Sequence, residues 1–157
     1  MYMYIAHLIQ YVAIVVSLII LFLDRKGMTK YIPVAMFASL YSNLWCYIAN
    51  YFHLWSYQHK LFPIVKDISV TVNMIVVPIV VMIWIKHIPK TLKGKFIWTF
   101  IWTTGLTLDE FLIERYTQVL TYHNGYDWYY SYILWFISWF LWAEYHKWQM
   151  KSIMKTN

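Results

Sequence analysis

Long apolar runs alternate with short basic segments along the chain. Five of these runs, residues 4–23, 31–52, 68–85, 96–116 and 128–148, are long enough to cross roughly 30 Å of hydrocarbon as helices, at about 1.5 Å per residue. In lipid a single segment satisfies its own backbone only as a helix, so even the valine-rich third run is expected to be helical. The pattern predicts one domain, residues 1–157, folded as an all-α bundle of five transmembrane helices.

Pro78 lies inside the third run. A proline within a helix has no amide hydrogen to donate, and it frees the carbonyl of the residue four positions earlier, here Met74. We therefore expect a kink near the middle of this helix.

The fourth run needs its own argument, because its apolar part, residues 96–108, is too short to span and Asp109 follows directly. If all five runs span and the N-terminus lies outside, ten of the thirteen lysine and arginine residues lie on the inner side. If the fourth run turned back instead, the split would be seven to six. Basic residues concentrate on the cytoplasmic side of membrane proteins. The fourth helix is therefore expected to cross, which puts the C-terminus inside.

Composition also indicates a membrane protein. Apolar residues make up 61% of the chain and charged residues 13%, which excludes disorder and would leave a soluble protein with an excess of exposed apolar surface. The 10 tryptophans and 15 tyrosines suit helices anchored at membrane interfaces. The net charge is +6, and the basic residues lie in the short loops between the apolar runs. This distribution indicates membrane topology. It does not form a phosphate-binding face, so no nucleic-acid partner is predicted. The expected surroundings are a lipid bilayer.

Polar residues of the fourth run share one helix face, since positions three and four apart lie on the same side. They are Thr99, Thr103, Thr107, Glu110, Glu114, Thr117 and Thr121. A polar stripe on a membrane helix faces the bundle interior or a wet cavity. Glu110 and Glu114 are therefore expected one turn apart on the inward face, in the outer half of the membrane, with Asp109 and Arg115 pointing elsewhere.

Polar residues of the other runs gather at the same outer level. Together with the two glutamates they predict an outward-facing polar pocket for a small solute or an ion. The candidate binding residues are Glu110, Glu114, His7, Asn50, His53, Asn73, Trp128 and Ser131.

Three interpretations of Glu110 and Glu114 stay open. The pair can belong to a hydrogen-bond network between helices, since buried polar groups seek partners there. It can relay a proton or a cation, because two carboxylates one turn apart in a low dielectric resist double ionisation. A metal site with His7 or His53 is a third option, but no H-x-x-E or HExxH spacing supports it, so no metal ligands and no cofactor are predicted.

Motifs of enzymes are not found. The chain has no GxSxG, no glycine-rich phosphate loop and no CxxC, and its single cysteine, Cys46, lies two helical turns from His53. The segment DEFLIER is one residue out of register with the EExxxR signature of intramembrane prenyl-protease-like proteins. A non-enzymatic role is therefore expected.

Aromatic residues of the fifth run recur at spacings of four and three, which places them along one helical stripe. They are Trp128, Tyr132, Trp135, Trp139 and Trp142. The stripe is expected to be a packing ridge against neighbouring helices, with a ligand-stacking surface as the other interpretation. An alternative function follows from it: a structural or accessory subunit that docks on a partner membrane protein, or on a second copy of the chain, through this helix.

The C-terminal third, about residues 100–148, carries a short motif. A glutamate-bearing helix is followed by an outer loop with tyrosines, then by W-x-x-S at the start of an aromatic last helix. The residues are Glu110 or Glu114, Tyr122, Tyr126, Trp128 and Ser131, with EYHKW at residues 144–148. This arrangement resembles a family of small, uncharacterised multi-helix membrane proteins from spore-forming Gram-positive bacteria. The resemblance implies a multi-pass protein of the bacterial plasma membrane and no specific activity.

Overall fold

The chain is mostly helical in its computed structural model, which describes residues 2–65 and 68–156. Within these ranges the α-helices are α1 (Tyr2–Leu23), α2 (Ile32–Tyr51), α3 (Val77–Lys86), α4 (Leu92–Tyr116) and α5 (Trp128–Thr156). A 3₁₀ turn, η1 (Met28–Tyr31), precedes α2, and a π-helical turn, η2 (Thr71–Val76), leads into α3. Two short strands complete the list, β1 (Trp55–Tyr57) and β2 (Leu120–Tyr122). Each predicted run overlaps a helical segment, although the third is divided between η2 and α3, and α4 and α5 are longer than predicted.

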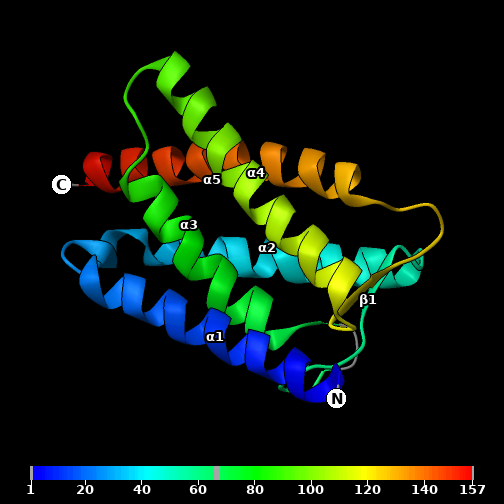
Figure 1. Cartoon of the computed structure of the whole chain (residues 1–157). Coiled ribbons are helices and arrows are strands. Elements are labelled where there is room, and N and C mark those ends of the chain that lie inside the picture. Colours follow the sequence, from blue (N-terminus) through cyan, green and yellow to red (C-terminus); the bar gives the residue numbers. More distant parts are fainter. Residues whose placement is uncertain (1, 66–67, 157) are drawn as a thin grey trace.

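Successive helices run back and forth between two ends of the bundle (Figure 1). At one end, which we name the basic end, Lys86 donates to the Asp24 carboxylate over 2.6 Å and joins the loop after α1 to the end of α3. At the other, which we name the capped end, β1 and β2 pair antiparallel, with Ser56 opposite Thr121. The strands belong to the loops that follow α2 and α4, so their pairing closes this end of the bundle.

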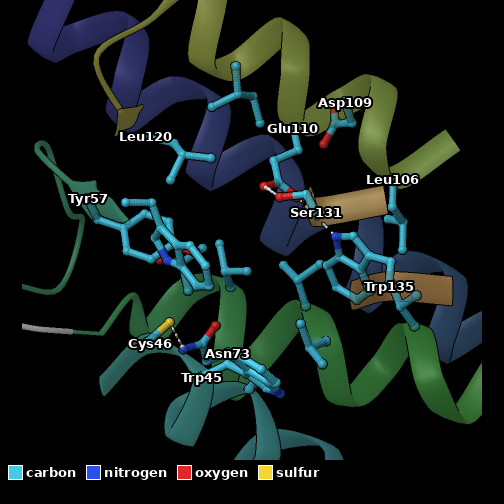
Figure 2. A pocket seen from close by; sticks show the side chains of 18 of the residues that line it. Trp45, Cys46, Tyr57, Asn73, Leu106, Asp109, Glu110, Leu120, Ser131 and Trp135 are labelled. Carbon is cyan, nitrogen blue, oxygen red and sulfur yellow. Dashed lines mark hydrogen bonds between the residues drawn. The ribbon is translucent and has the colours of Figure 1, made fainter. Parts of the chain in front are cut away.

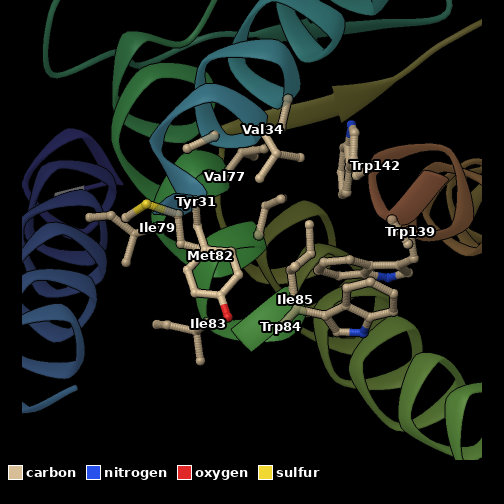
Figure 3. Packing of buried hydrophobic residues seen from close by; sticks show 14 of the residues in the cluster. Tyr31, Val34, Val77, Ile79, Met82, Ile83, Trp84, Ile85, Trp139 and Trp142 are labelled. Atoms are coloured by element: carbon tan, nitrogen blue, oxygen red, sulfur yellow. The ribbon is translucent and has the colours of Figure 1, made fainter. Parts of the chain in front are cut away.

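α3 forms the centre of the core, because its side chains are buried almost all round. Trp84 is fully buried and stacks on Trp139 of α5, with ring centroids 4.9 Å apart. Trp142 packs nearby, with Val34 of α2 in the same cluster (Figure 3). The expectation of a packing ridge on α5 is confirmed for Trp139 and Trp142, which are 0% and 1% exposed.

The irregularity expected at Pro78 is present, and it takes the form of a π-helical turn. η2 ends directly before Val77, and the Val77 amide donates to the Val72 carbonyl, five residues back. Pro78 follows directly after this turn, inside a helix that continues from η2 into α3, and the wider π-turn accommodates a residue that has no amide hydrogen to donate. The wider turn places Thr71 and Asn73 in the interior, where both are buried. π-turns of this kind are frequent at functional sites.

Two helices of the described chain are long and apolar enough to cross a membrane, Tyr4–Leu23 and Met28–Tyr51. The segment Thr71–Lys86 is apolar but shorter. The surface of the bundle is nevertheless apolar over other helices as well. Exposed apolar side chains include Leu8, Val12, Val15, Ile19, Met36, Leu40, Leu44, Phe96, Phe100, Ile101, Leu108, Ile133, Ile137 and Leu141.

Candidate functional site

The carboxylate of Glu110 is the centre of a hydrogen-bond cluster near the capped end (Figure 2). Tyr122 donates its hydroxyl to Glu110 Oε1 over 2.7 Å, and Ser131 donates to the same oxygen over 2.6 Å. Trp135 donates its indole N–H to Glu110 Oε2 over 3.0 Å. Since the only hydroxyl hydrogen of Ser131 is used in this way, Tyr126 is the donor in the 2.9 Å bond to Ser131 Oγ. The carboxylate is thus bound from β2 and from α5 at once.

This geometry suits an ionised glutamate, because a carboxylate accepts every one of these bonds and donates none. Burial, together with the nearby Glu110 charge, raises the pKa of the Tyr122 hydroxyl, which therefore remains a donor. Burial also raises the pKa of Tyr126. No lysine, arginine or histidine of the described residues forms an ion pair with Glu110. The donors to this carboxylate are thus two hydroxyls and an indole N–H, with no basic side chain among the described residues.

A cavity of about 190 Å³ lies beside Glu110. On its far side Asn73 donates both to Asn43 Oδ1 and to Cys46 Sγ, each over 3.0 Å, and this group faces the glutamate across the cavity (Figure 2). Burial, followed by the neighbouring Cys46 and Glu110, raises the pKa of the Tyr57 hydroxyl in the same wall. The cavity therefore has an acidic wall on α4 and a neutral polar wall on α2 and η2.

Aromatic rings make up much of the remaining lining of this cavity. They are Tyr41, Trp45, Trp55, Tyr57, Tyr126, Trp135 and Trp142. Several of them meet edge to face: Tyr41 lies at 87° to Trp142 with centroids 6.0 Å apart, and at 74° to Trp45. These lining rings therefore do not form one flat stack.

Gln10 of α1 closes the cavity on the side of the loop after β1. Its amide nitrogen donates to the His59 carbonyl over 2.6 Å and to the Ala6 carbonyl over 3.1 Å. Its amide oxygen accepts from the Leu61 amide over 3.0 Å and from the Thr71 hydroxyl over 3.3 Å. One buried side chain thus fixes the capping loop to α1 and to η2.

The structure brings together three of the candidate residues and separates the others. Glu110, Asn73 and Ser131 line the cavity. Glu114 and Trp128 line a second, shallower depression of about 360 Å³, together with Arg115 and Asp127. Tyr122 and Tyr126 also line this depression, and Tyr126 lines the cavity as well. The segment 122–126, which we name the tyrosine loop, thus lies between the two glutamates. The two glutamates of the predicted pair thus line different hollows, although both residues lie on one helix face.

His7, Asn50 and His53 lie outside the cavity lining. Asn50 and His53 are exposed at the end of α2, where His53 takes up a positive φ of 51° as the chain turns towards β1. The described residues contain no group of three histidine, cysteine, aspartate or glutamate side chains that could hold a metal ion. The metal interpretation with His7 or His53 thus has no geometric support.

Sequence reasoning missed several residues of the site. Asp109 was expected to point elsewhere, yet it lines the cavity at an exposed position beside Glu110. The signal was present, because Leu106, Asp109, Glu110 and Ile113 have the spacing of one broad helix face and all four line the cavity. Tyr57 had no local signal, since it reaches the site only through the pairing of β1 with β2.

Comparison of the chain with family models, with curated proteins and with solved structures finds no match. Four of the residues that carry the resemblance in the C-terminal third meet in space, while Trp128 lines the second depression. Glu110, Tyr122, Tyr126 and Ser131 are the members of one hydrogen-bond cluster. Their spacing along the chain therefore has a structural reason within this protein, which is the binding of the glutamate.

Proposed function

We propose that the chain is a five-span membrane protein that binds a small solute in the cavity beside Glu110, from the extracytoplasmic side. The observation that carries this proposal is the Glu110 carboxylate itself: it is bound by three donors, has no basic partner among the described residues, and borders a cavity of about 190 Å³. A charge placed in a membrane helix without a counter-charge is costly, so it marks a functional site.

Five spans are supported by how the polar residues of α4 and α5 are placed. α4 has 25 residues and α5 has 29, which is enough to cross. The threonines of α4 that lower its hydropathy, Thr99, Thr103 and Thr107, are buried in the bundle, and Trp139 and Trp142 of α5 are buried too. Their outer faces carry apolar side chains such as Phe100. Such helices present an apolar side to lipid even though their composition is mixed.

The shorter Thr71–Lys86 segment fits the same arrangement. At about 1.5 Å per residue it covers roughly 24 Å, less than the hydrocarbon thickness. It is the central helix, and most of its side chains are buried against other helices. A helix surrounded by protein does not need to match the thickness of the bilayer.

The basic residues support the orientation. Arg25, Lys26, Lys30, Lys86 and Lys90 lie in or beside the two connections of the basic end, and the C-terminal lysines extend from α5 on the same side. The positive-inside rule places this end in the cytoplasm. The capped end, with Glu110 and the cavity beneath it, then faces the outside of a bacterial plasma membrane. Membership of the family that the C-terminal motif resembles is part of the same proposal.

The docking alternative has less support. It assigns partner binding to the aromatic stripe of α5, but Trp139 and Trp142 are buried in the core, and Trp135 donates to Glu110. A face that is already packed inside the bundle is not available to a partner. The exposed residues Ile133, Ile137 and Leu141 of α5 suit lipid equally well.

Cys46 tests the proposal, because it is the only thiol of the chain and lines the cavity. Methyl methanethiosulfonate, a small neutral reagent, is expected to modify Cys46 in the folded, detergent-solubilised protein faster than the protein unfolds. Mass spectrometry of the intact chain measures the rate, and the same chain in denaturant is the control.

A reporter that works only in the cytoplasm, fused to the C-terminus, tests the orientation. A Cys46 that reacts only after unfolding, or a silent cytoplasmic reporter, would overturn the proposal.

A further inference from the structure

We propose that the ligand of this cavity is a small organic monocation, an alkylated ammonium ion, held by Glu110 and by the surrounding aromatic rings. The inference rests on the proposed function, since it requires that a solute reach the cavity. It specifies the kind of solute that enters the cavity. Four features of the lining support it.

The first feature is the charge of the lining. Among the described residues that border the cavity, Glu110 and Asp109 are the only charged side chains, and both are acidic. Asp109 is exposed and lies at the rim, while Glu110 is half-buried further in. Lys60 lies outside this lining, although its charge acts on Cys46. The charges that border the cavity itself are acidic and favour a cation over an anion.

The second feature is the unused acceptor capacity of Glu110. A carboxylate offers about four lone-pair positions, and the three donors from Tyr122, Ser131 and Trp135 occupy three of them. These donors orient the carboxylate and leave its negative charge in place. A cation in the cavity would supply the missing counter-charge.

The third feature is the aromatic enclosure. A cation over the face of a tryptophan or tyrosine ring is attracted by the quadrupole of the ring, and cages of such rings recognise quaternary ammonium groups. Here Tyr41 stands edge to face against both Trp45 and Trp142, and Trp135 lies at 72° to Trp142. Rings that meet at these angles present faces and edges from several directions, as a cage does.

The fourth feature is size and coordination. A cavity of about 150 Å³ holds benzene, so about 190 Å³ accommodates a compact organic ion. A metal ion would need several ligands of the histidine, cysteine or carboxylate type, and the described residues contain no such group. A phosphate has no lysine, arginine or histidine in the described lining to bind it. The lining thus favours a free ammonium ion over the headgroup of a phospholipid.

Charged thiol reagents measure this selectivity at Cys46. The trimethylammonioethyl and sulfonatoethyl methanethiosulfonates are similar in size and opposite in charge, and each forms a mixed disulfide with Cys46 Sγ and releases methanesulfinate. The ratio of the two rates, divided by the same ratio for the unfolded chain, is expected to be at least about ten in favour of the cation. Glu110→Gln is expected to bring this ratio close to one, and Asp109→Asn to lower it less.

A second test, which needs no variant, measures how far an added ligand slows the modification of Cys46. Choline is expected to slow modification by methyl methanethiosulfonate at a concentration at least about tenfold lower than 3,3-dimethylbutanol, its neutral analogue of the same shape. Phosphocholine separates the two sources of the ammonium group: weaker protection than choline supports a free cation, and stronger protection would overturn that choice. Equal protection by choline and the neutral alcohol, with equal corrected rates for both charged reagents, would overturn the cation inference while leaving an open cavity. A Cys46 that even the neutral reagent does not reach would instead overturn the proposed function.

Discussion

Trp135 of α5 donates its indole N–H to the carboxylate of Glu110 on α4, with 3.0 Å between Nε1 and Oε2. The bond crosses the contact between the two helices, and α4 packs on α5 more extensively than on any other helix. Ser131, one turn before Trp135 on α5, donates to the other oxygen of the same carboxylate. Glu110 therefore fixes the register of α4 against α5, in addition to its proposed part in binding.

Replacing Glu110 by glutamine tests this structural part of its role. If the glutamine oxygen keeps the bond from Trp135, its NH2 group faces the hydroxyl oxygens of Tyr122 and Ser131, which can accept from it but then lose the acceptor of their own hydrogens. In the other orientation the NH2 group opposes the indole N–H of Trp135, which can only donate. We expect Glu110→Gln to lower the free energy of unfolding by about 1–3 kcal/mol, the cost of leaving buried donors without a partner. Denaturation in detergent, followed by tryptophan fluorescence, measures the change.

Glu114→Gln is the matched control for this substitution. Glu114 is one turn further along the same helix, and it lines the shallow depression on the other side of the tyrosine loop. Its replacement is expected to change the free energy of unfolding by no more than about 0.5 kcal/mol. Equal destabilisation by both substitutions would contradict the separation of the two glutamates.

Much of the fold could be predicted from the sequence, because each helix has a local signature. The apolar runs mark where helices lie, and the burial of Thr99, Thr103 and Thr107 follows from their common face. The strands β1 and β2 had no such signature. Each has three residues, and the two strands are separated by more than sixty positions of the chain. No tight turn joins them, so the sequence has no hairpin signal that would predict their pairing.

The site was harder to predict than the fold. Helical spacing correctly placed Glu110 towards the interior, but spacing says nothing about where a neighbouring helix begins. α5 starts at Trp128, and the tyrosine loop before it covers the carboxylate of Glu110 and lies between that side chain and Glu114. Whether two residues on one face share a site thus depends on the loop that packs over them, which the spacing of residues on a helix does not describe.

Gln10 provides a test of how the capping loop is held. Gln10→Leu keeps a similar size but leaves the Leu61 amide and the His59 carbonyl without their side-chain partner. We expect a loss of about 1–3 kcal/mol in the free energy of unfolding, since buried polar groups without a partner are costly. Hydrogen exchange of the Leu61 amide is expected to become faster, which locates the effect in the loop.

His7→Leu serves as the comparison, because His7 lies on α1 one turn before Gln10 and does not line the cavity. This substitution is expected to stay within about 0.5 kcal/mol of the parent and to leave the exchange of Leu61 unchanged. If Gln10→Leu had as little effect as His7→Leu, the four hydrogen bonds of Gln10 would not be what fixes the loop.

At the basic end, Asp24 links stability to pH. The hydrogen bond from Lys86, and then that from His87, hold the pKa of the Asp24 carboxyl below its ordinary value of 3.8. A lowered pKa in the folded protein means that the charged carboxylate stabilises the fold at neutral pH. This contribution is present above pH 3.8 and is lost as the pH falls below that value and through the lower pKa of the folded state.

Asp24→Asn removes the titrating group and with it this pH dependence. We expect the variant to unfold at a lower temperature than the parent protein at pH 7, and the difference to shrink as the pH is lowered below about 4. Thermal denaturation in detergent between pH 3 and pH 7 measures the difference. Glu144→Gln provides the control, because Glu144 is exposed and, among the described residues, its recorded ion pair is with Lys147 one turn away. A surface pair of this kind contributes little. A difference for Asp24→Asn that stays constant over this range would show that the carboxylate acts through packing alone and that its charge does not stabilise the basic end.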